Sequence, residues 1–382
     1  MLERYAYLWW RSRRVQQFMA ATRHARRVQQ EVLLTKLRRN AESHFGREHG
    51  FSEIRSIADF RRNVPVAGFE YYRPYIDRVK RGELTAMFGH DTRLLMFAVT
   101  SGTTSDPKYV PITAEFFREY RRSWQLWGLR TYRDHLDLLR KQALQLSSDW
   151  RQSFTEAGIP CGNISGLAAE TAPWIARPMF IIPRELIRIH DPVSKHYTAL
   201  RIALASSRIG MMITANPSTL VEFGRLADNR RESLIRDIHD GTLSQDIDVS
   251  PEVRRALRRA LTAQPGRARE LEQCIANSGR LRLRDAWPDL SVLAVWTGGS
   301  VGVYVPQLIL SPLGSKVMAA GAMMAAIEHE LTVQYVETLR YDFDCTAGAD
   351  ESDAREMIVH IWLHGPVYAG YHQRPGHAGV AS

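Results

Sequence analysis

The sequence predicts an α/β fold with a mostly buried sheet, because three uncharged apolar runs each end in a turn of small residues. The runs are residues 94–99 (LLMFAV), 210–215 (GMMITA) and 291–296 (SVLAVW). Continuous apolar runs of this length are typical of strands covered on both faces. The turns that follow are residues 100–104, 216–219 and 297–300. Since α/β sheets bind ligands at the carboxyl ends of their strands, we expect these three loops to surround one cleft.

The segment from residue 1 to about residue 45 is predicted to be helical. It contains no proline and no glycine before Gly46, and its apolar residues recur close to helical spacing. The arginines between them would form a solvated face, and a nucleic-acid-binding arm is the alternative interpretation.

Later segments also carry local signals. Residues 64–66 (VPV) break the periodicity and predict a loop, and residues 69–81 predict a short helix. Thr113 is a plausible N-cap for a helix that runs from Ala114 to about Arg130, because its hydroxyl can accept a first-turn amide. Residues 220–285 are charged and helical in pattern, with prolines 251 and 265 as breaks.

The composition is that of an ordinary globular protein with a basic charge balance. The 382 residues, 45% of them apolar and 24% charged, suffice for one large or two medium domains. A net charge of +10 favours anionic ligands such as nucleotides or nucleic acid. No nucleic-acid recognition motif is visible, so we expect no nucleic-acid partner.

Cysteine usage and hydropathy bear on the compartment. The three cysteines are far apart and form no CxxC pair, which favours a reducing environment. Arginines interrupt the apolar residues of the N-terminus, unlike a signal peptide, and the longest apolar run, 317–327, is too short to span a bilayer. We therefore expect a cytoplasmic protein without a membrane partner, and leave its oligomeric state open.

The strongest chemical signal is the string at residues 100–113 (TSGTTSDPKYVPIT). Four hydroxyls flank one glycine directly after an apolar run, so backbone amides and hydroxyls can face phosphate oxygens together. The predicted phosphate-binding residues are Ser101, Gly102, Thr103 and Thr104, with Lys108 as a point charge. A Ser/Thr-rich turn is the alternative, and the Walker A pattern is absent.

This string resembles the phosphate-binding motif T-S-G-T-T-G-x-P-K of the adenylate-forming superfamily, with Ser105 at the second glycine. Over residues 1–315 the chain resembles the auxin-responsive Gretchen-Hagen-type acyl-acid–amido synthetases and their microbial relatives. Besides the phosphate loop, the matching stretches are VPV at 64–66, YYRPYI at 71–76, GIP at 158–160, ISG at 164–166, NPSTL at 216–220, LIRDI at 234–238, DGT at 240–242, WTGG at 296–299 and YVP at 304–306.

The resemblance implies the large N-terminal domain of the adenylate-forming, acyl-CoA synthetase-like fold, with the small C-terminal domain absent. It implies ATP- and Mg²⁺-dependent adenylation of a carboxylic acid and transfer of the acyl group to an amino acid. Thr297, Gly298 and Gly299 join the candidate nucleotide-binding residues, whereas no catalytic residue and no protein metal site is assigned. A non-catalytic nucleotide- or acyl-binding remnant is the alternative.

Residues 316–382 depart from the family pattern. The second motif of the family would lie near residues 320–330, where only Glu328 could mimic it, and five histidines gather in the last part of the chain. One hypothesis is that this tail is truncated or read in a shifted frame. We accordingly expect the chain as given not to complete amide formation, since the family closes its small domain over the site.

Overall fold

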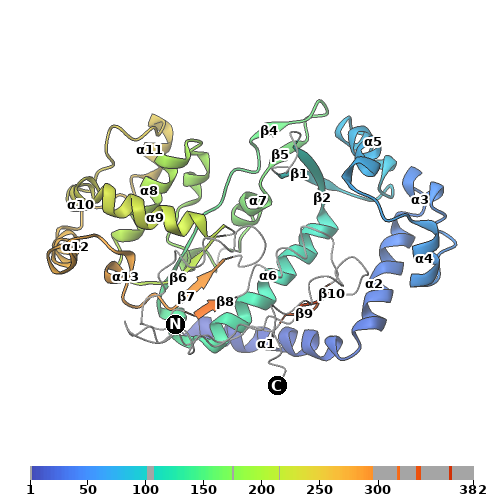
Figure 1. The fold of residues 1–382 in the computed structure, drawn as a ribbon, viewed down its shortest axis with the longest axis horizontal. Helices are drawn as coiled ribbons and strands as arrows, with labels where there is room; N and C mark the ends of the chain where they lie inside the picture. The colour runs from blue at the N-terminus through green and yellow to red at the C-terminus, as the bar shows by residue number, and fades with distance from the viewer. Residues whose placement is uncertain are drawn as a thin grey trace, which may run out of the picture.

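The computed structural model describes residues 2–100, 107–173, 176–214 and 216–295, and the backbone of three short strands at 316–318, 333–336 and 361–363. Helices α8 to α13 gather at one end of the molecule and α2 to α5 at the other, with the two larger sheets and the long helix α6 between them (Figure 1). Among these residues no helix is long and apolar enough to cross a membrane.

The first sheet has the strand order β2-β1-β5-β4. Its strands are β1 (Leu94–Thr100), β2 (Lys108–Thr113), β4 (Ser153–Phe154) and β5 (Pro160–Gly162). β1 pairs antiparallel with β2, so that Thr100 lies opposite Lys108, and parallel with β5. Residues 108–113, the end of the string at residues 100–113, therefore form an edge strand. Pro111 is tolerated there because an edge strand has backbone positions that need no partner.

The second sheet is parallel throughout, with the order β3-β6-β7-β8. Its strands are β3 (Gln142–Gln145), β6 (Ile209–Ile213), β7 (Val292–Ala294) and β8 (Lys316–Met318). β6 and β7 are the second and third predicted apolar runs. Our expectation of one sheet is thus wrong, since β1 belongs to the other sheet. Hydrophobicity indicates that a strand is buried but does not determine which strand it pairs with.

The N-terminal third is largely helical, as predicted. It contains α1 (Leu2–Thr22), α2 (Ala25–Arg39), α3 (His44–Glu48), α4 (Ile57–Asn63), α5 (Phe69–Lys80) and the 3-10 turn η1 (Leu84–Ala86). The predicted single segment is interrupted between α1 and α2. Both helices contact α6 (Ala114–Asp134). Arg14 of α1 donates a hydrogen bond to Gln125 at 3.3 Å, and Lys36 of α2 pairs with Glu119 at 2.8 Å. The Thr113 cap is confirmed, since its hydroxyl accepts the amide of Phe116 at 3.1 Å.

The other helical elements follow β2 and surround the parallel sheet. They are the 3-10 turns η2 (Leu136–Arg140), η3 (Arg177–Met179) and η4 (Arg184–Arg188) and the helices α7 (Ile164–Glu170), α8 (Pro192–Leu204), α9 (Ser218–Asn229), α10 (Arg231–Asp240), α11 (Pro251–Leu257), α12 (Pro265–Ser278) and α13 (Leu283–Ala286). Prolines 251 and 265 occupy the first position of α11 and α12, where the missing N–H has no consequence. Ser218 and Thr219, expected in a loop, instead begin α9.

The largest hydrophobic core lies between these helices and the parallel sheet. Tyr197, Leu200, Phe223, Leu234 and Trp287 are among its fully buried members. The two remaining strands, β9 (Val333–Val336) and β10 (Ile361–Leu363), pair antiparallel with each other.

Candidate functional site

A cavity of about 860 Å³ opens where the strands of the parallel sheet end. Residues at or just beyond the carboxyl ends of β3, β6 and β7 line it, namely Gln145 to Ser148, Ile213, Thr214, Ala294 and Val295. Parallel strands gather their carboxyl ends at one edge, which is where α/β proteins bind ligands. The ends of the second and third apolar runs thus line one cavity, whereas residues 101–104 and 297–300 of the expected cleft lie outside the described residues.

One wall of the cavity is the aromatic face of α6. Tyr120, Trp124, Trp127 and Tyr132 line it, and the indoles of Trp124 and Trp127 meet edge to face at 5.4 Å between centroids. Both indole N–H groups are buried and have no acceptor within the described part of the chain. A buried donor without an acceptor is costly. The helix was predicted from the sequence, but its contribution to the cavity wall was not. The helical spacing of Tyr120, Trp124 and Trp127, at positions i, i+4 and i+7, is the sequence signal that indicates such an aromatic face.

The charged residues of the described wall are all of one sign. The cavity is lined by Arg11 from α1, Arg121 from α6, Arg177 from η3, Arg184 from η4 and Lys195 from α8. No aspartate and no glutamate occurs among the described lining residues. Cations around a partly enclosed apolar space focus a positive potential on it. The cavity is therefore suited to a ligand that combines a large apolar body with a negative group.

Lys195 and His196 enter the wall from the first turns of α8. Burial lowers the pKa of Lys195, and the charge of Asp149 opposes this shift. Burial likewise lowers the pKa of His196, whose ring meets that of Phe223 edge to face at 5.2 Å. His196 is thus held toward its neutral form, which leaves Lys195 as the charged residue that α8 contributes to the cavity wall.

The predicted phosphate loop lies at the junction of β1 and β2. Ser101, Gly102, Thr103 and Thr104 fall outside the described residues, but the strand before them is described. In the parallel pair, Ala98 lies opposite Gly162, and the residue after Gly162 is Asn163, which lines the cavity. The carboxyl end of β1 therefore lies beside the carboxyl end of β5, and Asn163 of the cavity wall follows directly after β5.

The remaining predicted residues have different positions. Lys108 is half-buried at the start of β2, and its Nζ lies 5.9 Å from the ring centroid of Phe69 on α5, away from the described lining of the cavity. Thr297, Gly298 and Gly299 lie outside the described residues, although Val295, two positions earlier, lines the cavity. From the predicted loop 216–219, Asn216 and Thr219 reach the wall.

Comparison with known proteins decides the family. The chain matches the GH3 family N-terminal domain over residues 14–311. It belongs to the GH3 family. The family resemblance drawn from the motifs is thereby confirmed.

Individual GH3 proteins are distant in sequence but alike in fold. The chain is 24% identical over 299 residues to the indole-3-acetic acid-amido synthetase GH3.5 of Arabidopsis thaliana, covering 75% of this chain and 48% of that one. It is 26% identical over 305 residues to the jasmonoyl–L-amino acid synthetase GH3.3 of Oryza sativa subsp. japonica, covering 77% and 65%. The structure of the AtGH3.15 acyl acid amido synthetase in complex with 2,4-DB superposes with a TM-score of 0.70 at 21% identity, over 80% of this chain and 54% of that chain. The α/β fold is thus confirmed, and the chain spans about half the length of most of these relatives.

One GH3 stretch, residues 234–242 (LIRDIHDGT), builds a buried network beside the site. The Asp237 carboxylate accepts hydrogen bonds from the hydroxyls of Tyr197, Thr242 and Ser244 at 2.7, 2.9 and 2.8 Å. The fully buried Arg201 donates to the carbonyls of Asp237 and Thr242 at 2.8 and 3.0 Å. These residues lie outside the described cavity wall and instead connect α8 to α10, which holds the α8 residues of the wall in place.

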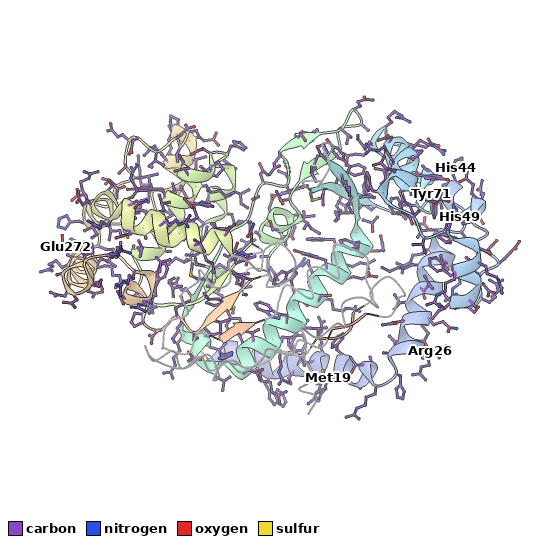
Figure 2. All side chains as sticks on the ribbon, viewed as in Figure 1. Met19, Arg26, His44, His49, Tyr71 and Glu272 are labelled. Carbon is purple, nitrogen blue, oxygen red and sulfur yellow. The ribbon has the colours of Figure 1, made fainter. Side chains whose placement is uncertain are left out.

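A second GH3 stretch, residues 71–76, packs at the opposite end of the molecule. Tyr71, Tyr72 and Tyr75 surround Phe45, and His49 hydrogen-bonds Tyr71 at 2.5 Å. Figure 2 shows His49 and Tyr71 next to each other there. This stretch contributes no described residue to the cavity and packs against Phe45 instead.

Metal ligands are the last element of the site. Among the described residues, no group of three histidine, cysteine, aspartate or glutamate side chains lies close enough to hold an ion.

Proposed function

We propose that this GH3 protein provides the acid-binding and phosphate-binding parts of an acyl-acid–amido synthetase. The observation that carries the proposal is the cavity at the strand ends, whose described wall joins an aromatic face to several cations and contains no carboxylate. An apolar carboxylic acid matches both properties, because its body is favoured by the aromatic wall and its charge by the arginines.

The acid would lie with its apolar body against Trp124 and Trp127. Arg121, one helical turn before Gln125 on the same helix, supplies a charge at the wall. Relatives named for indole-3-acetic acid and for jasmonoyl conjugates also act on carboxylic acids with a large apolar body.

ATP would enter as the second substrate, as its magnesium complex, with its phosphates at the loop between β1 and β2. Ser101, Gly102, Thr103, Thr104 and Lys108 are the residues proposed to bind them, with Thr297, Gly298 and Gly299 on the neighbouring loop. A carboxylate oxygen of the acid attacks the α-phosphorus, the bond to the pyrophosphate oxygen breaks, and pyrophosphate leaves. The negative charge that develops at the α-phosphate requires nearby donors, which such a loop provides.

Transfer of the acyl group would follow. The amine of an amino acid attacks the acyl carbon, the bond to the AMP oxygen breaks, and the nitrogen loses a proton. The chain spans about half the length of most of the relatives compared above, and no described residue is assigned to this second step.

A non-catalytic nucleotide- or acyl-binding protein is the second candidate, favoured by that partial coverage. Acid-dependent release of pyrophosphate separates the two. The purified chain is incubated with Mg²⁺, ATP and a panel of carboxylic acids, with each matched amide as control. We expect pyrophosphate only with an acid. Binding of ATP and acid without pyrophosphate release would support the non-catalytic candidate, and amino-acid-dependent conjugate formation would establish the complete reaction.

A further inference from the structure

Lys195 is a cation of the cavity wall for which the described protein offers no partner. It lines the cavity and is partly buried, yet its ammonium group forms no hydrogen bond and no ion pair with any described residue. The Asp149 carboxylate interacts electrostatically with Lys195, but its Oδ1 already accepts a hydrogen bond from the backbone amide of Arg151 at 2.9 Å. The other cations of the wall are arginines, which share its sign.

The position of Lys195 within α8 adds a second unfavourable contribution. The helix begins at Pro192, and the Asp191 side chain caps it by accepting the amide of Ser194 at 2.7 Å. The amide of Lys195 makes the first backbone bond of the helix, to the carbonyl of Asp191 at 2.9 Å. The amino-terminal turn of a helix carries partial positive charge and disfavours a cation. Burial and helix position therefore both oppose an ammonium group here.

An anion that enters the cavity would offset both contributions. A carboxylate beside Lys195 would pair with the ammonium group and would also be favoured by the amino-terminal end of α8. The alkyl stem of Lys195 keeps the group at the wall, while the Tyr197–Asp237 contact holds the helix.

We propose that Lys195 is a carboxylate-binding residue of this cavity, kept without a partner among the described residues at the expense of stability so that a substrate carboxylate completes its ion pair. The inference rests on the proposed function for its substrates. Two sources of the carboxylate are available, the acyl acid and the acceptor amino acid, and the experiment distinguishes them.

The test measures thermal unfolding and binding without ATP, so that it is independent of turnover. The native protein, Lys195→Met, Lys195→Arg and Lys36→Met are compared. Lys36→Met is the matched control, because it removes the same charge from an exposed side chain paired with Glu119 outside the cavity. Ligands are phenylacetate with its neutral analogue phenylacetamide, L-alanine with L-alaninamide, and inorganic phosphate.

We expect Lys195→Met to raise the unfolding midpoint of the ligand-free protein by roughly 1–3 °C, since an unpaired buried charge is removed. The same variant should bind the carboxylate at least about tenfold more weakly, whereas Lys195→Arg and Lys36→Met retain it. Stabilisation by phenylacetate identifies the acyl acid as the source, and stabilisation by L-alanine identifies the acceptor.

Several results would overturn the proposal. A lower midpoint for ligand-free Lys195→Met would indicate a structural role. An unchanged carboxylate affinity in that variant, binding of phosphate alone, or no stabilisation of the native protein by phenylacetate, L-alanine or phosphate would also contradict it. If instead the Lys195 effects are found but acid-dependent pyrophosphate release is not, the inference holds and the proposed function fails.

Discussion

The hydroxyl of Tyr197 donates a hydrogen bond to the carboxylate of Asp237 over 2.7 Å, and this contact joins α8 to α10 within the largest core. Tyr197 is completely buried, and Asp237 is 2% exposed. Because Tyr197 is two residues after Lys195, the contact also determines how the first turns of α8 face the cavity. The network is thus a structural support for a wall of the site.

Loss of that hydroxyl should lower the free energy of unfolding. We expect Tyr197→Phe to be destabilised by about 1.5–3 kcal/mol, the range for a hydrogen bond to a charged group. Asp237→Ala should cost more, about 3–5 kcal/mol, because the buried Arg201 would lose its compensating charge. Urea unfolding measures both. Tyr109→Phe serves as the control and should stay within roughly 0.5 kcal/mol of the native value, because its hydroxyl lies outside this network. Equal effects of the two tyrosine variants would contradict the assigned role.

The pH dependence of stability should report the same carboxylate. Burial tends to raise the pKa of Asp237, but the hydrogen bonds from Tyr197, Ser244 and Thr242 outweigh it and hold the pKa below its usual value. A lowered pKa stabilises the folded state above the unfolded pKa, and this contribution is lost as the pH falls through the folded pKa. The native protein should therefore lose more stability between pH 6 and acid pH than Asp237→Asn does. Parallel unfolding curves for the two proteins across that range would be inconsistent with this assignment.

Two glycines should respond in opposite ways to the same added methyl group. A Cβ at Gly166 on α7 would lie 2.1 Å from the carbonyl oxygen of Ser148, whereas a Cβ at Gly224 on α9 would meet nothing within 4 Å. Gly166→Ala should therefore lose about 1–3 kcal/mol or more through a clash with backbone. Gly224→Ala should gain about 0.5–1 kcal/mol of helix stability. Thermal unfolding of both variants checks the pair, and a stable Gly166→Ala would show that α7 can move away from Ser148.

Arg121 should matter for the acid but not for ATP. We expect Arg121→Met to raise the KM for the acid about tenfold or more and to leave the KM for ATP nearly unchanged, since a charged partner of the acid is lost. Arg133→Met is the matched control, because Arg133 lies on the same helix, is exposed and is outside the described wall. Pyrophosphate-release kinetics give both constants. Comparable changes in the two variants would mean that the helix, and not the cavity charge, is affected.

Lys108 provides the corresponding test for the nucleotide. Lys108→Ala should weaken ATP binding by about 1–3 kcal/mol, with Lys36→Ala as an exposed control of the same charge. Because Lys108 lies beside Phe69, binding requires its side chain to turn toward the loop. Calorimetric titration with ATP measures the effect, and unchanged affinity would remove Lys108 from the phosphate site.

Local features of the fold could be predicted because local physics decides them. The apolar run at 94–99 forms β1, Thr113 caps α6, and Pro265 begins α12. Each outcome depends on burial preference, a first-turn hydrogen bond or a fixed backbone angle within a few residues. The motifs likewise identified the GH3 family. Strand pairing was a different matter, because β1 is paired with residues 108–113 and with β5, and no local property of β1 specifies those partners.

The sequence by itself determined the family, the helices and which segments are buried, since these follow from motif chemistry and from the period of apolar residues. Only the tertiary structure decided that Arg11, Trp127 and Lys195, from three helices far apart in the chain, face one cavity. It also decided that Asp237 supports the core, whereas the ammonium group of Lys195 has no partner among the described residues. Such assignments depend on long-range packing, in which many weak contacts select one arrangement of elements, and a charge shows its role only once its surroundings are known.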